Sequence, residues 1–274
     1  MEMIDQLSST LVRILIGSVY PLALRQSLYF RLLSSHFSWP KGCVRCQLEF
    51  APVVMEALRQ SDSMHRQIAW LGFYELNLSR KIVSLARTGG ILVDVGANIG
   101  YFTCLWTGLG TNNLVYAFEP SPDVCSMLRR NIEVNALQDR VKAFEFALGH
   151  ESGTAMFDPC SEQESGWGGL MTKTSPNAFL VNVRRLDEML SADVTVDVLK
   201  IDTEGADTWV LFGAERLLRA KQIKHVFFER NESRMAQLGI KPGEAERFLS
   251  DCGYRVSSLG ASTGNELWAT RADS

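Results

Sequence analysis

The spacing of apolar residues changes near residue 90 of this 274-residue chain. Before that point the pattern is helical but irregular, and residues 64–86 form its clearest helical stretch. From Ile91 onward, short runs rich in Val, Ile and Leu alternate with helical stretches. Runs that are apolar on both faces are typical of strands buried in a parallel sheet. The pattern therefore predicts a helical N-terminal extension followed by an α/β domain.

The α/β part is predicted to contain seven main strands. They lie at 91–95, 114–119, 141–148, 196–201, 223–229, 254–258 and 266–270, with helices at 99–107, 123–136, 205–220 and 243–252 and two short strands at 154–157 and 179–184. Strands that alternate with helices at this spacing indicate a doubly wound, mostly parallel sheet with helices on both faces. Ligands bind outside the carboxyl ends of such strands, so the chemistry is expected there.

A glycine turn, DVGANIG, follows the first predicted strand at residues 94–100. Gly96 and Gly100 allow a sharp turn that approaches a ligand closely. The GxxxG spacing differs from the GxGxxG of dinucleotide-binding folds, which makes a nicotinamide oxidoreductase a poor interpretation. Asp94 offers an acceptor, and Asn98 offers a donor or an acceptor. These groups suit the ammonium at the amino-acid end of S-adenosylmethionine.

Glu119 ends the second predicted strand, about 20 residues beyond the glycine turn, and a carboxylate at that spacing is placed to accept both ribose hydroxyls. An isolated glutamate is usually solvated, so the turn and the carboxylate are more specific together than apart. We therefore predict that Asp94, Gly96, Asn98, Gly100 and Glu119 hold S-adenosylmethionine.

Three stretches together resemble the FkbM family of methyltransferases: DVGANIGYFT from residue 94, FEPSP from residue 118 and LKIDTEGAD from residue 199. Upstream, GFYE at residues 72–75 resembles the family's short GxYE stretch. The resemblance covers residues 72–270. It implies a Rossmann-like class I methyltransferase domain over 72–274, preceded by an N-terminal helical extension over 1–71.

The resemblance also implies an activity, namely the transfer of a methyl group from S-adenosylmethionine to hydroxyl oxygens of natural products and sugars. It places Ala147, after the third strand, against the adenine. Asp207 stands where the family usually has Glu, a change that keeps the charge and shortens the side chain.

Acidic residues follow the fourth and fifth predicted strands: Asp202 and Glu204 after one, Glu229 after the other, with Asn231 beside it. Neighbouring strands of this fold would bring Glu229 near Asp202. Two interpretations stay open. Asp202, Glu229 and Asn231 form an oxygen-ligand site for Mg²⁺, which would lower the pKa of a substrate hydroxyl. Alternatively, one of Asp202, Glu204 and Glu229 is a catalytic general base.

Three further residues have a functional and a structural interpretation. Lys200 alternates with Ile201, so it is expected on the opposite face, in a salt bridge from the flank of the strand. His65 lies in the helix before the domain, and a lone histidine is more often structural than a base. Trp167 lies in the Gly-rich loop 161–175, which forms either a lid over the cleft or a mobile surface loop.

The residues after the fourth strand favour oxygen as the acceptor atom. N-methyltransferases often carry an Asn/Asp-Pro-Pro-aromatic turn there, whereas this chain has Asp-Thr-Glu-Gly. An N-methyltransferase and a non-catalytic binding protein of the same fold remain alternatives, although the intact glycine turn and Glu119 argue against the second. Residues 1–88 and 158–178 are expected to set the acceptor, a saccharide or a secondary metabolite.

Composition limits the partners. Hydrophobic residues make up 46% of the chain, charged residues 22%, and the net charge is −3, which is ordinary for a globular protein. Binding to nucleic acid needs clustered Lys and Arg, so we expect a small-molecule or saccharide substrate and no nucleic acid. Six irregularly spaced cysteines favour a reducing, cytoplasmic location. The single CxxC, Cys43 and Cys46, lacks the four ligands of a structural zinc site.

The N-terminal apolar run at residues 11–24 is interrupted by Arg13 and Pro21. It falls short of the roughly 20 apolar residues that a membrane-spanning helix needs. Residues 11–33 are therefore expected to form an amphipathic helix. It would touch a membrane surface or a partner, or pack on the catalytic domain or across a homodimer, as most amphipathic helices face a core.

Overall fold

The computed structural model describes residues 15–33, 45–56, 58–160, 165–172, 175–260 and 265–272. Its centre is a seven-stranded sheet in the order β12-β13-β11-β10-β3-β4-β5. The strands are β3 (Gly90–Val95), β4 (Asn113–Phe118), β5 (Val141–Phe144), β10 (Val196–Ile201), β11 (Ile223–Glu229), β12 (Tyr254–Ser258) and β13 (Glu266–Arg271). Among these described strands, β13 pairs antiparallel with β11 and β12, and the other neighbouring pairs are parallel. The predicted mostly parallel, Rossmann-like sheet is confirmed.

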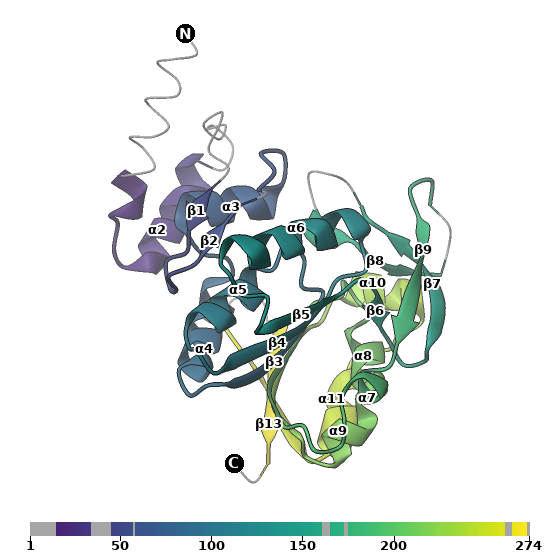
Figure 1. The fold of residues 1–274 in the computed structure, drawn as a ribbon. Coiled ribbons are helices and arrows are strands. Elements are labelled where there is room, and N and C mark those ends of the chain that lie inside the picture. The colour runs from purple at the N-terminus through teal and green to yellow at the C-terminus, as the bar shows by residue number, and fades with distance from the viewer. Residues whose placement is uncertain are drawn as a thin grey trace.

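Helices cover both faces of this sheet (Figure 1). One face carries α4 (Leu76–Ala86), α5 (Tyr101–Gly108) and α6 (Pro122–Val134), and the other carries α7 (Leu186–Met189), α8 (Asp207–Gly213), α9 (Glu215–Arg219) and α11 (Glu244–Asp251). Because strand side chains alternate between faces, Leu92 and Val93 belong to different buried clusters. The helix predicted over 205–220 is interrupted at Ala214, which separates α8 from α9.

A second, four-stranded sheet lies beside the first in the order β6-β9-β7-β8. It consists of β6 (Ala147–Leu148), β7 (Gly153–Asp158), β8 (Gly169–Met171) and β9 (Phe179–Arg184). The prediction of one third strand over 141–148 is therefore wrong, because the chain leaves the central sheet after Phe144 and Ala147 pairs with Val183. Both segments are buried, so the apolar run alone did not mark the crossing between the sheets.

The single helix predicted over 64–86 is wrong as well. It is two helices, α3 (Ser63–Leu71) and α4, separated by a turn. Gly72 ends α3 in the left-handed conformation with φ 75°, which stops a helix. An added Cβ there would lie 3.2 Å from the backbone nitrogen of Glu49. The break has a functional consequence, because it directs Tyr74 and Glu75 to the carboxyl edge of the sheet.

The N-terminal part packs onto the α/β domain. It contains α2 (Leu22–Leu28), η1 (Tyr29–Leu33), β1 (Cys46–Gln47) and β2 (Val54–Met55). Leu22 and Tyr29 share a buried cluster with Phe102 of α5. Arg25, only 2% exposed, donates to Glu49 Oε2 at 2.7 Å. These contacts match the packed alternative among the expectations for residues 11–33, of which 11–14 lie outside the described residues.

Five large apolar side chains of this N-terminal part remain exposed: Leu15, Tyr20, Leu24, Phe30 and Leu32. None of the helices in the described part of the chain is long and apolar enough to cross a membrane. Of the two cysteines of the CxxC, the structure describes only Cys46, which is buried and whose thiol donates to the carbonyl of Ile68. Cys43 lies outside the described residues.

Candidate active site

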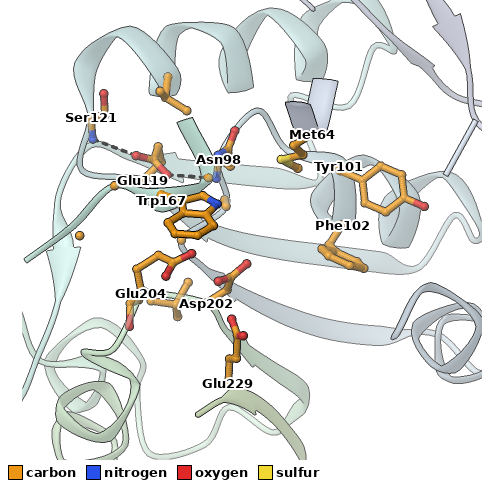
Figure 2. Close-up of a pocket in the computed structure, with 18 of the residues that line it drawn as sticks. Met64, Asn98, Tyr101, Phe102, Glu119, Ser121, Trp167, Asp202, Glu204 and Glu229 are labelled. Carbon is orange, nitrogen blue, oxygen red and sulfur yellow. Dashed lines mark hydrogen bonds between the residues drawn. The ribbon is translucent and has the colours of Figure 1, made fainter. Parts of the chain in front are cut away.

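A cavity of about 290 Å³ opens at the carboxyl ends of β3, β4, β10 and β11. Its floor is the turn from Val95 to Asn98, and its side walls carry Glu119 and Asp202. Residues from α3 and the α3–α4 turn close one side, and Trp167 lies over the opening in the close-up view (Figure 2). The cavity lies where a doubly wound sheet binds its ligands.

Gly96 makes the floor possible. It has φ 71°, and an added Cβ would overlap the carbonyl oxygen of Asp202 on the neighbouring strand end. The N–H groups of Gly96 and Ala97 both donate to the carbonyl of Phe118, at 3.0 Å. Gly100 serves a different purpose, since it lines no part of the cavity. A Cβ added at Gly100 would lie 2.5 Å from Leu128 Cδ1, so the glycine leaves room for the leucine side chain. Of the two glycines, Gly96 is the one a ligand would meet.

Glu119 faces the turn (Figure 2). Its Oε2 accepts from the backbone N–H of Asn98 at 3.0 Å, and its Oε1 accepts from that of Ser121 at 2.9 Å. The side chain is 6% exposed, and burial raises its pKa to about 7. Each carboxylate oxygen has a further lone pair, so both can accept from a ligand as well. Ala147 lines the same cavity from β6.

Asp94 lies behind the cavity wall. It is fully buried, and its Oδ2 accepts from Thr103 Oγ1 at 2.7 Å. Its Oδ1 lies 3.6 Å from Lys200 Nζ. Asp94 therefore does not line the cavity. It would act on a ligand indirectly, through its ion pair with Lys200 and the position of the glycine turn.

Lys200 lines the cavity, a position that the sequence did not indicate. The predicted salt bridge exists, but it lies inside the cleft and not on the flank of the strand. The ammonium lies 3.2 Å from Asp202 Oδ2 and donates to the carbonyl of Gly96 at 3.4 Å. Burial lowers the pKa of Lys200, but the neighbouring carboxylates Asp202 and Asp94 outweigh burial and hold that pKa above its usual value. Lys200 thus links the glycine turn to the acidic strand ends.

Asp202, Glu204 and Glu229 come together as predicted, each with one carboxylate oxygen within 4.8 Å of the others. We call these three residues the acidic cluster. Burial, followed by the charges of Asp202 and Glu204, raises the pKa of Glu229 to about 8. Burial and the charge of Asp202 raise that of Glu204 to about 7. The cluster can accept a proton near neutral pH or surround a cation.

Asn231 lies beside the cluster but its amide is occupied. Its Oδ1 accepts from the backbone N–H of Arg234 and caps α10 (Glu232–Leu238). Its Nδ2 donates to Glu204 Oε2 at 2.8 Å. Glu204 joins Asp202 and Glu229 in a group of carboxylates that could hold a cation, and Asn231 contacts that group through Glu204.

Asp207 carries a role that the sequence reasoning missed. Its carboxylate accepts from the N–H and hydroxyl of Thr203 and from the N–H of Glu229 at 2.8 Å. It is 3% exposed, and burial raises its pKa to about 6. The sequence offered one signal for this role, an acidic residue shortly after the end of a strand, within the stretch LKIDTEGAD. Asp207 fastens the two strand ends that carry the acidic cluster.

Tyr74 and Glu75 were also missed as site residues, although GFYE was noted as a motif. Glu75 begins α4 with a left-handed backbone, φ 42°, an uncommon conformation for a non-glycine residue. Burial and the charge of Asp202 raise the pKa of Glu75 well above its usual range. The charge of Glu75, followed by burial, does the same for Tyr74. Both residues therefore belong to the electrostatic surroundings of the acidic cluster.

Within the loop 161–175 the structure describes residues 165–172 and 175, and the first of these segments forms a 3₁₀ turn (Ser165–Trp167) and strand β8. Arg234 Nη2 donates to the carbonyl of Trp167 at 2.6 Å, and Thr172 donates to the carbonyl of Gln237. The Trp167 ring is 55% exposed and lines the cavity. This part of the loop is thus a fixed rim, while 161–164 and 173–174 lie outside the described residues.

His65 is structural, as favoured from the sequence. It is fully buried, its Nδ1 accepts from the N–H of Arg59 at 2.9 Å, and it does not line the cavity. Burial lowers its pKa. A neutral, enclosed imidazole at this position stabilises the start of α3 and does not reach the cleft.

Comparison with known proteins agrees with this geometry. A family model described as the methyltransferase FkbM domain matches residues 94–256. The chain is 28% identical over 178 residues to the hexuronic acid methyltransferase AglP of Haloferax volcanii, which covers 65% of this chain and 68% of AglP. It is 24% identical to the 2-O-methyltransferase NoeI of Sinorhizobium fredii (61% and 74%) and 30% identical to Methyltransferase 1 of Beauveria bassiana (45% and 58%). The matched region holds both the glycine turn and the acidic cluster.

Proposed function

The chain belongs to the FkbM methyltransferase family, and on that premise we propose that it is an S-adenosylmethionine-dependent O-methyltransferase whose acceptor is a saccharide or a related polyhydroxylated metabolite. The observation that carries the proposal is that the acidic cluster and Glu119 line one cavity. The relatives AglP and NoeI are named for a hexuronic acid and for 2-O-methylation, which supports a sugar hydroxyl as acceptor.

The cofactor would lie along the turn after β3. Glu119 would accept from the two ribose hydroxyls, and Gly96 and Asn98 would lie against the amino-acid end. Ala147 would lie against the adenine. Arg66 lines the same cavity, and its Nε makes no hydrogen bond within the described residues. We assign Arg66 as the partner of the cofactor carboxylate, a charge-assisted contact that the guanidinium favours.

Glu229 is the proposed general base. Its pKa of about 8 lies near the pH at which a base and its conjugate acid are both available. The hydroxyl proton passes to the Glu229 carboxylate while the hydroxyl oxygen forms a bond to the methyl carbon. S-adenosylmethionine, when bound, would supply that methyl group, and the electron pair of the carbon–sulfur bond would stay on its sulfur. Most of the rate enhancement comes from holding the oxygen in line with the methyl group.

Lys200 and Asp207 position the base. Lys200 fixes Asp202 from the side of the turn, and Asp207 holds the backbone of Glu229. Fixed charges beside the reacting atoms lower the barrier because they need no rearrangement during the reaction.

A divalent cation such as Mg²⁺ is a second candidate, favoured by the 4.8 Å spacing of the acidic cluster. Three carboxylates are a donor set that a hard cation prefers, so the residues fit the ion. Asp202, Glu204 and Glu229 would hold it, and it would supply Lewis acidity that lowers the pKa of the acceptor hydroxyl.

Methyl transfer to a panel of neutral and acidic sugars tests the proposal. Purified protein is incubated with S-adenosylmethionine, and products are analysed by mass spectrometry and NMR. An O-methyl product whose formation is lost in Glu229→Gln supports it. Methyl transfer only to amines would support the N-methyltransferase alternative. Failure of the protein to bind S-adenosylmethionine in calorimetry would support a non-catalytic protein.

A further inference from the structure

A second cavity, of about 360 Å³, adjoins the first on the acceptor side. We call it the outer cavity. Phe30, Gln67, Tyr74 and Glu75 line both cavities, so the two meet at these residues. The outer cavity, unlike the first, is lined by Gln26 of α2, Leu76 and Asn77 of α4, Ser258 and Glu266 of the last two strands, and Gly260, which follows β12. The N-terminal extension thus forms one wall and the β12–β13 hairpin the other.

Gln67 stands at the junction. It belongs to α3 and is only 8% exposed, and its side-chain amide makes no hydrogen bond to the described part of the chain. A side-chain amide has two donors and an acceptor, and at this position they are available to a ligand in the cavities. Because Gln67 lines both cavities, that ligand would pass from one to the other.

The outer cavity has the chemistry of a neutral, hydroxyl-rich ligand. Its described lining contains three amides, a serine and two carboxylates, and neither lysine nor arginine. Amides and carboxylates accept and donate to hydroxyl groups in many geometries. With neither lysine nor arginine, this lining offers no positive charge to a negatively charged ligand. The ring of Phe30, 53% exposed at the mouth, offers an apolar face to a sugar ring.

Glu75 connects the outer cavity to the chemistry. It lines both cavities, and the charges of Asp202, Lys200, Glu266 and Glu229 all act on its carboxylate. A ligand that fills the outer cavity therefore ends beside the acidic cluster. The backbone of Glu75 is left-handed, with φ 42°. Strained conformations of this kind persist at functional sites because the surrounding structure maintains them.

We propose that the outer cavity is a second acceptor subsite, which binds a neutral glycosyl unit attached to the sugar that is methylated. The inference rests on the proposed function and deepens it, because it identifies the acceptor as a disaccharide or longer glycan. The N-terminal extension then selects the acceptor by supplying Gln26, Phe30 and Gln67. The acceptor sugar would occupy the first cavity beside Glu229, and its neighbour would contact Gln67 and Asn77.

The test compares acceptors that differ by one sugar. Methyl glycosides of neutral hexoses and deoxyhexoses are assayed beside the matching methyl disaccharides, for methyl transfer and for binding to the S-adenosylhomocysteine-loaded protein by saturation-transfer NMR. Asn77→Ala and Gln26→Ala, at positions that line the outer cavity and not the first, are compared with wild type. Asn112→Ala and Gln138→Ala, at exposed positions away from both cavities, are the matched controls.

We expect at least one disaccharide to exceed its monosaccharide in kcat/KM by about tenfold or more, the gain typical of one or two added hydrogen bonds. Asn77→Ala and Gln26→Ala should remove that advantage and leave the monosaccharide rate unchanged, while the controls keep both. Equal rates for the two acceptor lengths, or equal losses for both in the variants, would overturn the subsite.

The binding measurement separates this failure from that of the proposed function. Disaccharides that bind more tightly than monosaccharides but receive no methyl group would leave the subsite standing and reject the methylation of sugars. Methyl transfer with no preference for the longer acceptor would do the reverse. Absence of both binding and transfer across the panel would reject both.

Discussion

The carboxylate of Asp207 accepts a hydrogen bond from the backbone N–H of Glu229 at 2.8 Å, from one strand end to the next. Its other oxygen accepts from Thr203, which lies between Asp202 and Glu204 in the chain. One buried side chain therefore sets the separation of all three members of the acidic cluster. This explains why an acidic residue is needed at a position that does not itself line the cavity.

Asp207→Asn should slow catalysis without weakening cofactor binding. The amide cannot accept from both Thr203 and the N–H of Glu229, so one strand end moves, and a misplacement of about 1 Å can cost roughly 100-fold in rate. We also expect a stability loss of about 1–3 kcal/mol for a buried donor left without its partner. Steady-state kinetics, calorimetry with S-adenosylmethionine and thermal unfolding measure the three quantities.

Asp187→Asn is the matched control, since Asp187 accepts from the backbone N–H groups of Arg216 and Leu217 far from the cavity. It should lose comparable stability and keep kcat. If both variants lose kcat equally, the effect of Asp207 is general destabilisation and not positioning.

Glu119→Gln should weaken S-adenosylmethionine binding by about tenfold to 100-fold, the range for hydrogen bonds to a charged group. Because the pKa of Glu119 is raised to about 7, the affinity of wild type should increase as pH rises from 6 to 8. Glu119→Gln should show no such increase. Isothermal titration calorimetry measures both, with Glu145→Gln at an exposed position as control. Unchanged affinity in Glu119→Gln would refute the assignment to the ribose.

The rate of methyl transfer should rise with pH and level off above about pH 8, because Glu229 must be ionised to accept a proton. Glu229→Gln should lower kcat by about 100-fold or more and abolish this rise. The exposed Glu232→Gln, on the next helix, should keep the wild-type profile. A variant at Glu229 that retains the rising limb would show that another group titrates.

Stability should change with pH in the opposite sense to that of most proteins. The pKa values of Glu119, Glu204, Asp207 and Glu229 are raised to about 7, 7, 6 and 8 in the folded state. The folded protein therefore binds more protons than the unfolded chain between about pH 4.5 and pH 8, and its free energy of unfolding falls as pH rises through that window. Thermal unfolding from pH 5 to pH 8.5 should show a decreasing Tm. Glu229→Gln should flatten the decrease, and a Tm that rises over this range would contradict the electrostatic description.

The periodicity of the sequence was sufficient for the central sheet and for the cofactor side of the site. β10 and β11 were predicted at their observed bounds because both are short runs in which apolar residues predominate. It failed where one apolar run serves two structures, as between β5 and β6, and where a single left-handed glycine breaks a helix, as at Gly72. Asp207, Lys200 and Tyr74 were not recognised as site residues because their roles depend on partners distant in the chain. The spacing of motifs locates a turn, but it does not show which buried charges face one another.

Removal of divalent cations distinguishes the two ways in which the acidic cluster can act. With Glu229 as the base, turnover should persist after dialysis against EDTA, and added Mg²⁺ should leave both kcat and the pH profile unchanged. With a cation in the cluster, EDTA should abolish turnover and Mg²⁺ should restore it. A bound cation stabilises the folded state by mass action, so Mg²⁺ would then also raise Tm at pH 8, where the carboxylates are ionised, more than at pH 5.5.

Glu204→Gln is the informative variant, because Glu204 would be a ligand if a cation is bound and only a neighbour of the base if Glu229 acts alone. We expect Glu204→Gln to retain activity that resists EDTA. A loss of activity that high Mg²⁺ reverses would support the cation mechanism and contradict Glu229 as the general base.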